Sequence, residues 1–373
     1  MREYKYRDQG EKIMDALREE VFSDKTQRSE VRKAPQNKKK FRKEWLCCWI
    51  VVALPFIGYI IFNAFPIGIS IVSMFTDIEH NQISTMTWNN FAHFKTFFHD
   101  AKFLHSLGIT FWLTTAQFVC LGIALLIATL LNSNLPGTKL MRTLYFIPYI
   151  CSTVAVSIMW GWIFGSGKAG VLNSFFGTEI EWTQEAKYIT WCVYFVILWQ
   201  APSYGIVMLT AALRGVDSTL YEAAKIDGAN TWKMYTKITL PQIAPMILFL
   251  ALAGWQGGLA TFDAVKVLAP LTWSGTAGPE NMGLTTSYYI YIQGVNFSHM
   301  DYASVMQWAM CIITFIGSYI FLRLRKRTEE NKEWRQKRQI FWKILSREAV
   351  RNASMKKNRY PVPVLLFLDR QIF

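Results

Sequence analysis

The side chains of residues 217–241 are spaced for docking rather than for catalysis. Asp217 and Thr219 are residue types that cap the start of a helix, and Glu222 follows Thr219 at the spacing of a capping box. Gly228 is placed to end that helix, because glycine adopts the left-handed conformation of a helix C-terminus without strain. The pattern predicts a short helix followed by a sharp bend, a shape that can fit a groove on a partner protein.

One face of this predicted helix carries small side chains. The helix is expected to start near Leu220, so Leu220, Ala223, Ala224 and Asp227 fall on one side at intervals of three and four residues. Methyl-sized side chains there let a partner backbone approach closely. A second short helix is expected over residues 230–237. The alternative is an ordinary loop that connects two apolar segments.

Familiar catalytic and metal-binding patterns are absent from the sequence. Residues 165–169 read Gly-Ser-Gly-Lys-Ala, which superficially resembles a phosphate loop, but the upstream glycine is missing and Ala169 stands where a magnesium-binding hydroxyl is needed. No HExxH, GxSxG or CxxC pattern occurs, and the six cysteines lie in apolar segments. We therefore predict no catalytic residues, no metal site and no cofactor on this chain.

The apolar residues, 52% of the chain, are gathered into blocks. Six stretches lack Asp, Glu, Lys and Arg over lengths that can cross a bilayer, which takes about 20 residues. We expect an all-α integral membrane protein whose transmembrane domain, residues 45–322, lies between basic tails at 1–44 and 323–373. The six predicted spans lie near residues 46–74, 106–131, 143–164, 189–212, 240–260 and 302–322.

Lysine and arginine are distributed unequally between the two sides of these spans. The side that holds both tails and the loop 214–239 carries 23 of them near the span ends, whereas the other side carries five. Because lysine and arginine favour the cytoplasmic side, both termini and this loop are predicted to lie inside the cell. The net charge of +14 can also indicate nucleic-acid binding, but these residues flank apolar blocks and favour anionic lipid instead.

The predicted spans contain no ionisable Asp, Glu, Lys or Arg. Ion-coupled transporters usually depend on such groups inside the membrane. If this chain belongs to a transporter, the energy must therefore come from another subunit.

The segment 217–241 also resembles a known coupling motif. Its order of Glu-Ala-Ala, three residues, Gly, nine residues and Ile-x-Leu-Pro is similar to the motif of the membrane subunits of ATP-binding-cassette (ABC) importers. The motif positions are Glu222, Ala223, Ala224, Gly228, Ile238, Leu240 and Pro241. Residues 141–149, 160–164 and 221–229 resemble carbohydrate permeases of the maltose-transporter type. The resemblance covers residues 46–324, and one departure is Asp217, where the family often has proline.

This resemblance implies the type I ABC importer permease fold, with six transmembrane helices, and the import of a sugar or oligosaccharide across the bacterial cytoplasmic membrane. It implies a second, different permease subunit, a dimer of ATPases that bind ATP and magnesium, and an extracellular solute-binding protein as partners. Glu222 would make a polar contact with the ATPase surface, Ala223 and Ala224 would pack closely against it, and Gly228 would form the bend. The other predicted coupling residues are Asp227, Ile238, Leu240 and Pro241. The alternatives are a peptide, polyol or glycerol phosphate as cargo, or a secondary transporter without an ATPase.

Polar and aromatic residues inside two predicted spans are candidates for a sugar pathway, because sugars bind through aromatic faces and through amide and hydroxyl hydrogen bonds. They are Trp199, Gln200, Tyr204, Trp255, Gln256 and Thr261. Glycines beside Trp255 and Gln256 would open space at a cavity wall. The alternative for each is an interfacial aromatic residue or a hydrogen bond between helices.

Overall fold

The structure, a computed structural model, describes residues 38–133, 136–272, 275–323 and 326. The chain divides into two compact units, Met1–Ile71 and Val72–Phe373. Most of both predicted basic tails lies outside the described residues.

The described part of the first unit is an almost continuous apolar helix. It comprises α2 (Lys38–Tyr59), the π turn η1 (Ile60–Ala64) and most of α3 (Phe65–Ser73). Its side chains are largely exposed, among them Phe56 and Phe62 at 63% and 78%. An apolar helix with exposed side chains suits the interior of a bilayer, where its backbone hydrogen bonds are satisfied internally.

The second unit begins with a small folded loop, residues 76–100. It contains β1 (Thr76–Asp77), the 3₁₀ turns η2 (Glu79–Asn81) and η3 (Ile83–Thr85), β2 (Thr87–Trp88) and α4 (Ala92–Phe98). The two short strands pair antiparallel, with Thr76 opposite Trp88, and are an exception to the expected all-α fold. Phe75 packs its ring against Trp88, Phe91 and Phe94 at centroid distances of 5.4–5.9 Å. This aromatic cluster holds the loop together.

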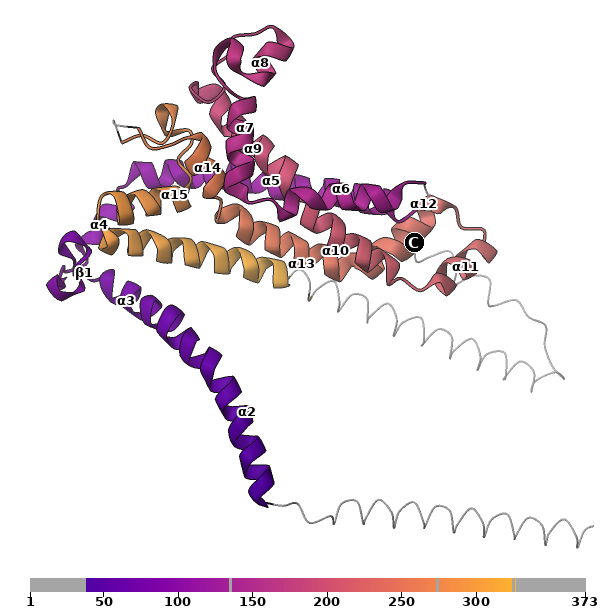
Figure 1. Ribbon diagram of the computed structural model, residues 1–373, viewed down its shortest axis with the longest axis horizontal. Coiled ribbons are helices and arrows are strands. Elements are labelled where there is room, and N and C mark those ends of the chain that lie inside the picture. Colours follow the sequence, from indigo (N-terminus) through magenta and orange to yellow (C-terminus); the bar gives the residue numbers. More distant parts are fainter. Residues whose placement is uncertain (1–37, 134–135, 273–274, 324–325, 327–373) are drawn as a thin grey trace, which may run out of the picture. The chain divides into compact units, whose positions relative to one another are not determined.

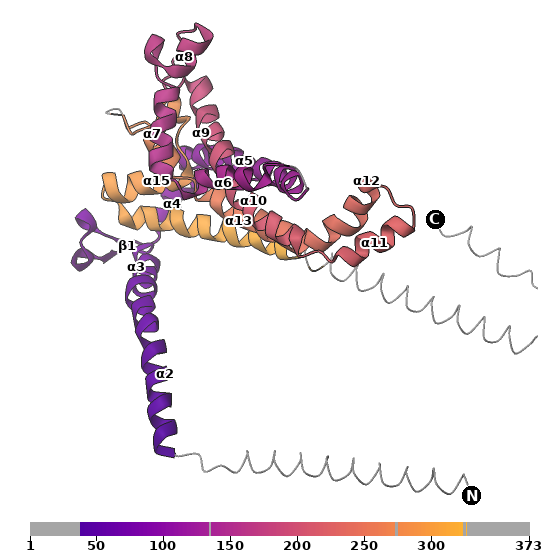
Figure 2. The ribbon, with the colours of Figure 1, turned by 45° about the vertical axis from the view of Figure 1, so that its right-hand side comes forward.

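The helix α5 (Ala101–Leu131) lies at the centre of the second unit. It packs against α9 (Ala186–Gln200), α10 (Pro202–Arg214) and α13 (Leu240–Leu259), as Figure 1 and Figure 2 show. Asp100 caps α5, because its Oδ1 accepts hydrogen bonds from the backbone N–H groups of Lys102 and Phe103 at 2.9 and 3.1 Å. The long helix therefore has a defined start.

The third predicted span is not one straight helix. The chain forms α6 (Thr138–Ile150) and α7 (Thr153–Ile163), which meet at an angle of 97°. Pro148 lies in the last turn of α6, and proline offers no N–H to the carbonyl four residues earlier. The bend leaves backbone carbonyls at the end of α6 without partners from their own helix.

The remaining elements complete the second unit. Those before α13 are η4 (Gly167–Ala169), α8 (Val171–Phe176), α11 (Ser218–Ile226), α12 (Thr231–Met234) and the π turn η5 (Tyr235–Thr239). Those after it are α14 (Asp263–Leu268), η6 (Pro279–Asn281), α15 (Thr286–Tyr291), the π turn η7 (Ile292–Asn296) and a last helix, Met300–Arg323.

Two of the π turns share a cause. Both η1 and η5 end two residues before a proline, Pro66 and Pro241 respectively. A proline ring inside a regular helix clashes with the carbonyl four residues earlier. The wider π turn relieves that clash, so the helix continues through the proline instead of ending.

The buried side chains of the second unit form two clusters. The larger joins α5 to α7, α9, α14 and α15, and includes Leu113, Ile189 and Val265. The smaller joins the C-terminal half of α5 to α10 and α13, and includes Leu209 and Ile243. Each cluster covers one half of α5, so this helix is the common support of both.

Glycines allow close contact between α5 and its neighbours. A Cβ atom at Gly205 in α10 would lie 2.9 Å from the Cβ atom of Ala124, and one at Gly258 in α13 would lie 2.7 Å from the methyl group of Thr114. Small residues at such crossings let membrane helices approach each other closely. Both crossings therefore have almost no free space.

The part of the chain that the structure describes has five helices long and apolar enough to cross a membrane, and six spans if α6 and α7 count as one. These helices overlap the six predicted apolar stretches. The prediction of a largely helical membrane fold is thus confirmed, while the predicted boundaries and orientation of the spans stay predictions.

Candidate functional site

The first candidate site is the segment Asp217–Pro241, which we call the coupling segment. Its helix α11 starts at Ser218, two residues earlier than expected, because Asp217 is the cap: its Oδ1 accepts a hydrogen bond from the N–H of Thr219 at 2.9 Å. This hydrogen bond lowers the pKa of Asp217 below its ordinary value of 3.8. Of the two caps that the sequence allowed, the structure uses Asp217.

The end of α11 is a Schellman motif. Gly228 has φ +72°, its N–H donates to the carbonyl of Lys225 at 3.1 Å, and the N–H of Ala229 donates to the carbonyl of Ala224 at 2.9 Å. Most other residues would be strained at this φ angle. The predicted bend at Gly228 is therefore present, and backbone hydrogen bonds fix its direction.

The second half of the coupling segment folds back onto the first. Asn230 caps α12 by accepting a hydrogen bond from the N–H of Lys233 at 2.8 Å. The hydroxyl groups of Tyr221 and Thr239 lie 2.8 Å apart and so join α11 to the π turn η5. The hydroxyl of Tyr235 lies 3.2 Å from that of Thr129 in α5. The segment is thus connected internally and is also attached to the helix that supports both buried clusters.

The outer surface of the coupling segment presents the expected docking residues. Glu222, Ala223, Asp227 and Gly228 are exposed, and Ala224 is half-buried. Of the later motif residues, Ile238, Leu240 and Pro241 are half-buried. Two large apolar side chains lie next to them with high exposure, Ile226 at 88% and Trp232 at 72%. Such exposed apolar side chains on an ordered segment are typical of a binding surface.

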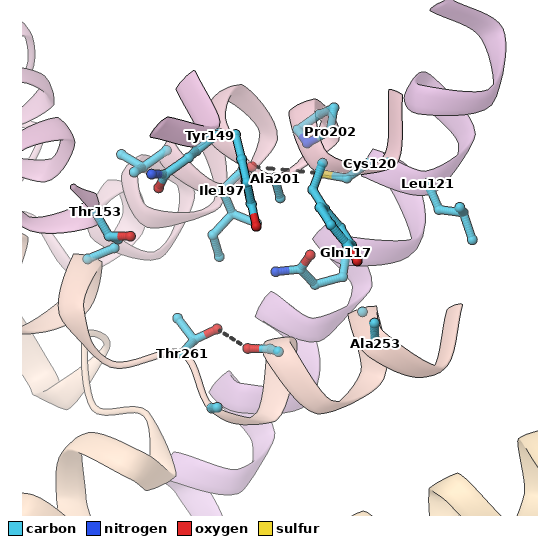
Figure 3. Close-up of a pocket in the computed structure, with 18 of the residues that line it drawn as sticks. Gln117, Cys120, Leu121, Tyr149, Thr153, Ile197, Ala201, Pro202, Ala253 and Thr261 are labelled. Atoms are coloured by element: carbon cyan, nitrogen blue, oxygen red, sulfur yellow. Dashed lines mark hydrogen bonds between the residues drawn. The ribbon is translucent and has the colours of Figure 1, made fainter. Parts of the chain in front are cut away.

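The second candidate site is a cavity of about 460 Å³ between α5, α6, α7, α9, α10 and α13, which we call the central cavity. Its polar lining side chains come from six helices, the sixth being α14 (Asp263–Leu268), and from one loop. Figure 3 shows several of them pointing into the same space. They are Gln117, Tyr149, Thr153, Gln200, Tyr204, Thr261 and Asp263. Amides and hydroxyls can both donate and accept hydrogen bonds, which suits a ligand rich in hydroxyl groups.

The bend between α6 and α7 forms part of the cavity wall. The amide nitrogen of Gln200 donates to the carbonyl of Cys151 at 3.1 Å and lies 3.4 Å from that of Pro148. The ring of Tyr149, at the end of α6, stacks on that of Tyr204 at a centroid distance of 5.3 Å. Gln200 therefore satisfies backbone carbonyls that the bend exposes, while the two tyrosines present aromatic surface beside it.

The structure brings three of the predicted pathway residues together. Gln200, Tyr204 and Thr261 all line the central cavity. Thr261 also donates its hydroxyl hydrogen to the carbonyl of Gly258 at 2.8 Å. Whether these residues contact cargo stays a prediction.

The other three pathway candidates lie elsewhere. The indole N–H of Trp255 donates to the carbonyl of Thr314 at 3.3 Å, and its ring fits against Gly317 of the last helix. Gln256 lines a separate groove between α13 and the last helix. The ring of Trp199 meets that of Trp160 edge to face at 6.2 Å. Of the glycines beside Trp255, Gly254 and Gly257 do line the central cavity, from the opposite face of α13.

Sequence reasoning missed four polar residues of the cavity. Gln117 is an amide inside the apolar helix α5, the same signal that identified Gln200 in the fourth span. Tyr149 and Thr153 flank the bend after Pro148, and that proline was the available signal. Asp263, at the start of α14, is the fourth missed residue, and among the described residues of the lining it alone carries an ionisable carboxylate, amine, guanidinium or imidazole.

The comparisons with known proteins agree on one family. Residues 120–330 match the family described as "Binding-protein-dependent transport system inner membrane component". This match covers more than half of the chain and includes the coupling segment.

The matches to three curated relatives cover most of the length of each relative. The "Probable ABC transporter permease protein YesP" of Bacillus subtilis (strain 168) is 32% identical over 298 residues, which is 78% of this chain and 94% of the relative. The "Lactose transport system permease protein LacF" of Rhizobium radiobacter is 30% identical, covering 75% and 94%. The "sn-glycerol-3-phosphate transport system permease protein UgpA" of Shigella flexneri is 29% identical, covering 74% and 92%.

Solved structures show the same fold. Chains in two crystal structures of bacterial ABC transporters for alginate match with TM-scores of 0.66 and sequence identities of 20% and 21%. Each match covers 78% of this chain and 98% of the other chain. One of these structures is described as a complex with an "alginate pentasaccharide-bound periplasmic protein". At this level of identity the match shows a shared fold.

Proposed function

This chain belongs to the family of binding-protein-dependent transport system inner membrane components, and we propose that it is the permease subunit of an ATP-driven ABC importer for a sugar or oligosaccharide. Members of this family are transporter subunits and not enzymes, so ATP and magnesium would bind to separate ATPase subunits. The proposed partners are those ATPases, a second and different permease, and an extracellular solute-binding protein. The chain would cross the bacterial cytoplasmic membrane several times with both termini inside.

The coupling segment is the observation that carries this proposal. Its helix, bend and return are each held by hydrogen bonds within the segment, yet Glu222, Ala223 and Ile226 remain exposed. A rigid segment with an unpartnered apolar and acidic surface supports a docking role. We propose that ATPase subunits closing on ATP push this segment, and that Tyr235 transmits the displacement to α5 through Thr129.

The cargo proposal rests on the chemistry of the central cavity and on the relatives. Stacked tyrosines beside glutamine and threonine side chains fit the faces and hydroxyl groups of a sugar. LacF is named as a permease for lactose, which supports a neutral sugar as the cargo here. UgpA is named for sn-glycerol-3-phosphate and supports the second candidate, a phosphorylated polyol.

The orientation can be tested with single cysteines in a cysteine-free background. Ile226→Cys lies in the coupling segment and Phe175→Cys lies in α8, and the native side chains are 88% and 82% exposed. In intact spheroplasts a membrane-impermeant maleimide should label Phe175→Cys only, whereas permeabilised cells should show both labelled. Labelling of Ile226→Cys in intact spheroplasts would place the coupling segment outside and overturn the proposal.

Coupling can be tested with a pair of charge reversals. We expect Glu222→Lys to reduce uptake at least tenfold at unchanged protein levels, while Glu181→Lys, an exposed glutamate before α9, leaves uptake unchanged. Co-purification of the ATPase subunits should also fall in Glu222→Lys alone. Equal uptake by the two variants would remove the coupling role.

The cargo can be identified by uptake of radiolabelled solutes in a deletion strain complemented with this chain. We expect uptake of a neutral sugar or oligosaccharide that stops when cellular ATP is depleted and continues when an ionophore collapses ion gradients. Uptake of glycerol phosphate alone would favour the second candidate. Uptake that needs an ion gradient but no ATP would indicate a secondary transporter instead.

A further inference from the structure

Three side chains that can bind a metal ion meet at the junction of the loop 76–100 and the last helix. Asp77 ends β1, His93 lies in the first turn of α4, and Asp301 is the second residue of the helix Met300–Arg323. The ligand atoms of the three residues all lie within 4.8 Å of one another. We propose that this Asp77–His93–Asp301 cluster binds a divalent transition-metal ion, and that Zn²⁺ is the ion it fits.

The distances suit a small tetrahedral ion. Nε2 of His93 lies 3.0 Å from Oδ1 of Asp77 and 3.3 Å from Oδ2 of Asp301. Zinc binds imidazole nitrogen and carboxylate oxygen at about 2.0–2.2 Å, so tetrahedral ligand atoms lie roughly 3.3–3.6 Å apart. The contact between His93 and Asp301 already has that separation, and a shift of a few tenths of an ångström would open the contact between His93 and Asp77 to it.

The charges of the cluster favour a divalent ion over a proton. Two carboxylates with a neutral imidazole carry a charge of −2, protonation of His93 reduces this to −1, and a divalent ion neutralises it. Among the described residues, the ion pairs of Asp77 and Asp301 are with His93 and involve no lysine or arginine. Taken as a whole residue, with its backbone, Asp301 is only 6% exposed. Uncompensated charge there is therefore unfavourable.

Neighbouring backbone groups hold Asp301 in position. The N–H groups of Ile78 and Tyr302 donate to the two oxygens of Asp301 at 3.0 and 2.7 Å, which fixes the plane of its carboxylate.

The fourth coordination position is accessible. The side chain of Asp77 is 56% exposed, whereas those of His93 and Asp301 are 17% and 9% exposed. Water can therefore complete the coordination on the side of Asp77. Imidazole and carboxylate together suit zinc, whereas calcium and magnesium prefer oxygen ligands alone.

Bound metal would connect two distant parts of the chain. Ile78 and Asp301 are 223 positions apart, and the loop 76–100 contacts the last helix beside this cluster. A metal ion would fix the folded loop to the start of the last helix. The consequence is an outer loop whose order depends on the supply of metal.

The test is zinc binding by the purified full-length chain in nanodiscs after treatment with a chelator. Isothermal titration should detect a site that is lost, with affinity reduced at least tenfold, in His93→Gln and Asp301→Asn. Glu79→Gln, an exposed acidic residue in the same loop, is the matched control and should bind as the wild type does. Asp77→Asn alters the most exposed ligand and is therefore the variant least expected to disturb folding. It should weaken zinc binding severalfold, which would show that the loss comes from the missing ligand and not from misfolding.

Two further measurements distinguish metal from a simple ion pair. Cobalt substituted for zinc should give the visible absorption of a tetrahedral site, and the signal should disappear in His93→Gln. Zinc should raise the thermal midpoint of the wild type, and at the same zinc concentration it should raise that of Asp77→Asn by less. Zinc binding that is equal in wild type and His93→Gln, or calcium binding as tight as zinc binding, would overturn the proposal.

Discussion

Among the described helices, α5 and α11 are each capped by an aspartate side chain, and the surroundings of the two aspartates differ. Asp100 caps α5 with Oδ1, while its Oδ2 accepts hydrogen bonds from the hydroxyls of Tyr289 and Tyr302 at 2.8 and 2.6 Å. Asp217 caps α11 through the N–H of Thr219. The partners of Asp100 lie 189 and 202 positions away, whereas the tie that closes the coupling segment spans 18 positions.

This difference in the sequence separation of hydrogen-bond partners shows two ways in which a region of the protein becomes rigid. The region around Asp100 is rigid because distant segments share one carboxylate, so each segment depends on the others. The coupling segment is rigid because residues close together in the chain form its hydrogen bonds with one another. Its surface therefore stays free for a partner. The first arrangement suits a fixed scaffold, and the second suits a part that moves as a unit.

The largest effect is expected from Asp100→Ala. This change removes the cap of α5 and leaves the hydroxyls of Tyr289 and Tyr302 without their acceptor, which together should cost about 3 kcal/mol or more. The apparent midpoint of thermal unfolding, followed by intrinsic fluorescence, should fall well below that of Asp217→Ala. Equal midpoints for the two variants would contradict the comparison.

Gly228→Val should have the next largest effect, and it should act on uptake more than on stability. A side chain at φ +72° costs about 1–2 kcal/mol, more when it is β-branched, and disturbs the Schellman motif. We expect uptake to fall roughly tenfold or more at equal protein levels, since 1.4 kcal/mol corresponds to a factor of ten.

Gly122→Val is the matched control for this change. An added Cβ atom meets nothing within 4 Å at either glycine, but Gly122 lies in the regular helix α5 and lacks a positive φ angle. A similar loss of uptake in both variants would show that the bend at Gly228 has no special role.

Tyr221→Phe tests the tie inside the coupling segment with a smaller change. Loss of the hydrogen bond to Thr239 should cost about 1 kcal/mol locally. We expect a severalfold decrease in uptake with an almost unchanged unfolding midpoint, because α11 would still be folded but less firmly joined to η5. Tyr59→Phe, at an exposed position of α2, should change neither quantity.

The smallest effect concerns the protonation of Asp217. Its pKa is lower in the folded protein than the ordinary 3.8, because the carboxylate accepts hydrogen bonds from Thr219. A lowered pKa stabilises the folded segment above about pH 3.8, and this stabilisation is lost as the pH falls through the lower folded value. Amide exchange should therefore show better protection of α11 in wild type than in Asp217→Asn at about pH 6. A difference that persists below the folded pKa would contradict this assignment.

The coupling segment could be predicted almost completely from the sequence, since its caps, bend and exposed face depend on residues close together in the chain. The start of α11 differed by two residues because Asp217 and Thr219 are both capable caps. The Asp77–His93–Asp301 cluster could not be predicted, because no spacing rule connects residues separated by more than two hundred positions. The lining of the central cavity could be predicted only in part: Gln200 and Tyr204 were expected, whereas Gln117 and Tyr149 were missed.

Trp255 shows why a residue type in a span does not define its role. An aromatic side chain beside glycines suits a cavity wall, but the same helix has two faces, and the sequence does not say which one turns inward. The structure directs the indole toward Gly317 and leaves Gly254 and Gly257 at the cavity.

The tight crossings at Gly205 and Gly258 have a mechanical consequence. With Ala124 and Thr114 already at the limit of approach, α5 has no clearance to slide along α10 or α13. We expect the three helices to rotate as one rigid body. A displacement of the coupling segment would then reach the far end of α5 without being lost to sliding between the helices.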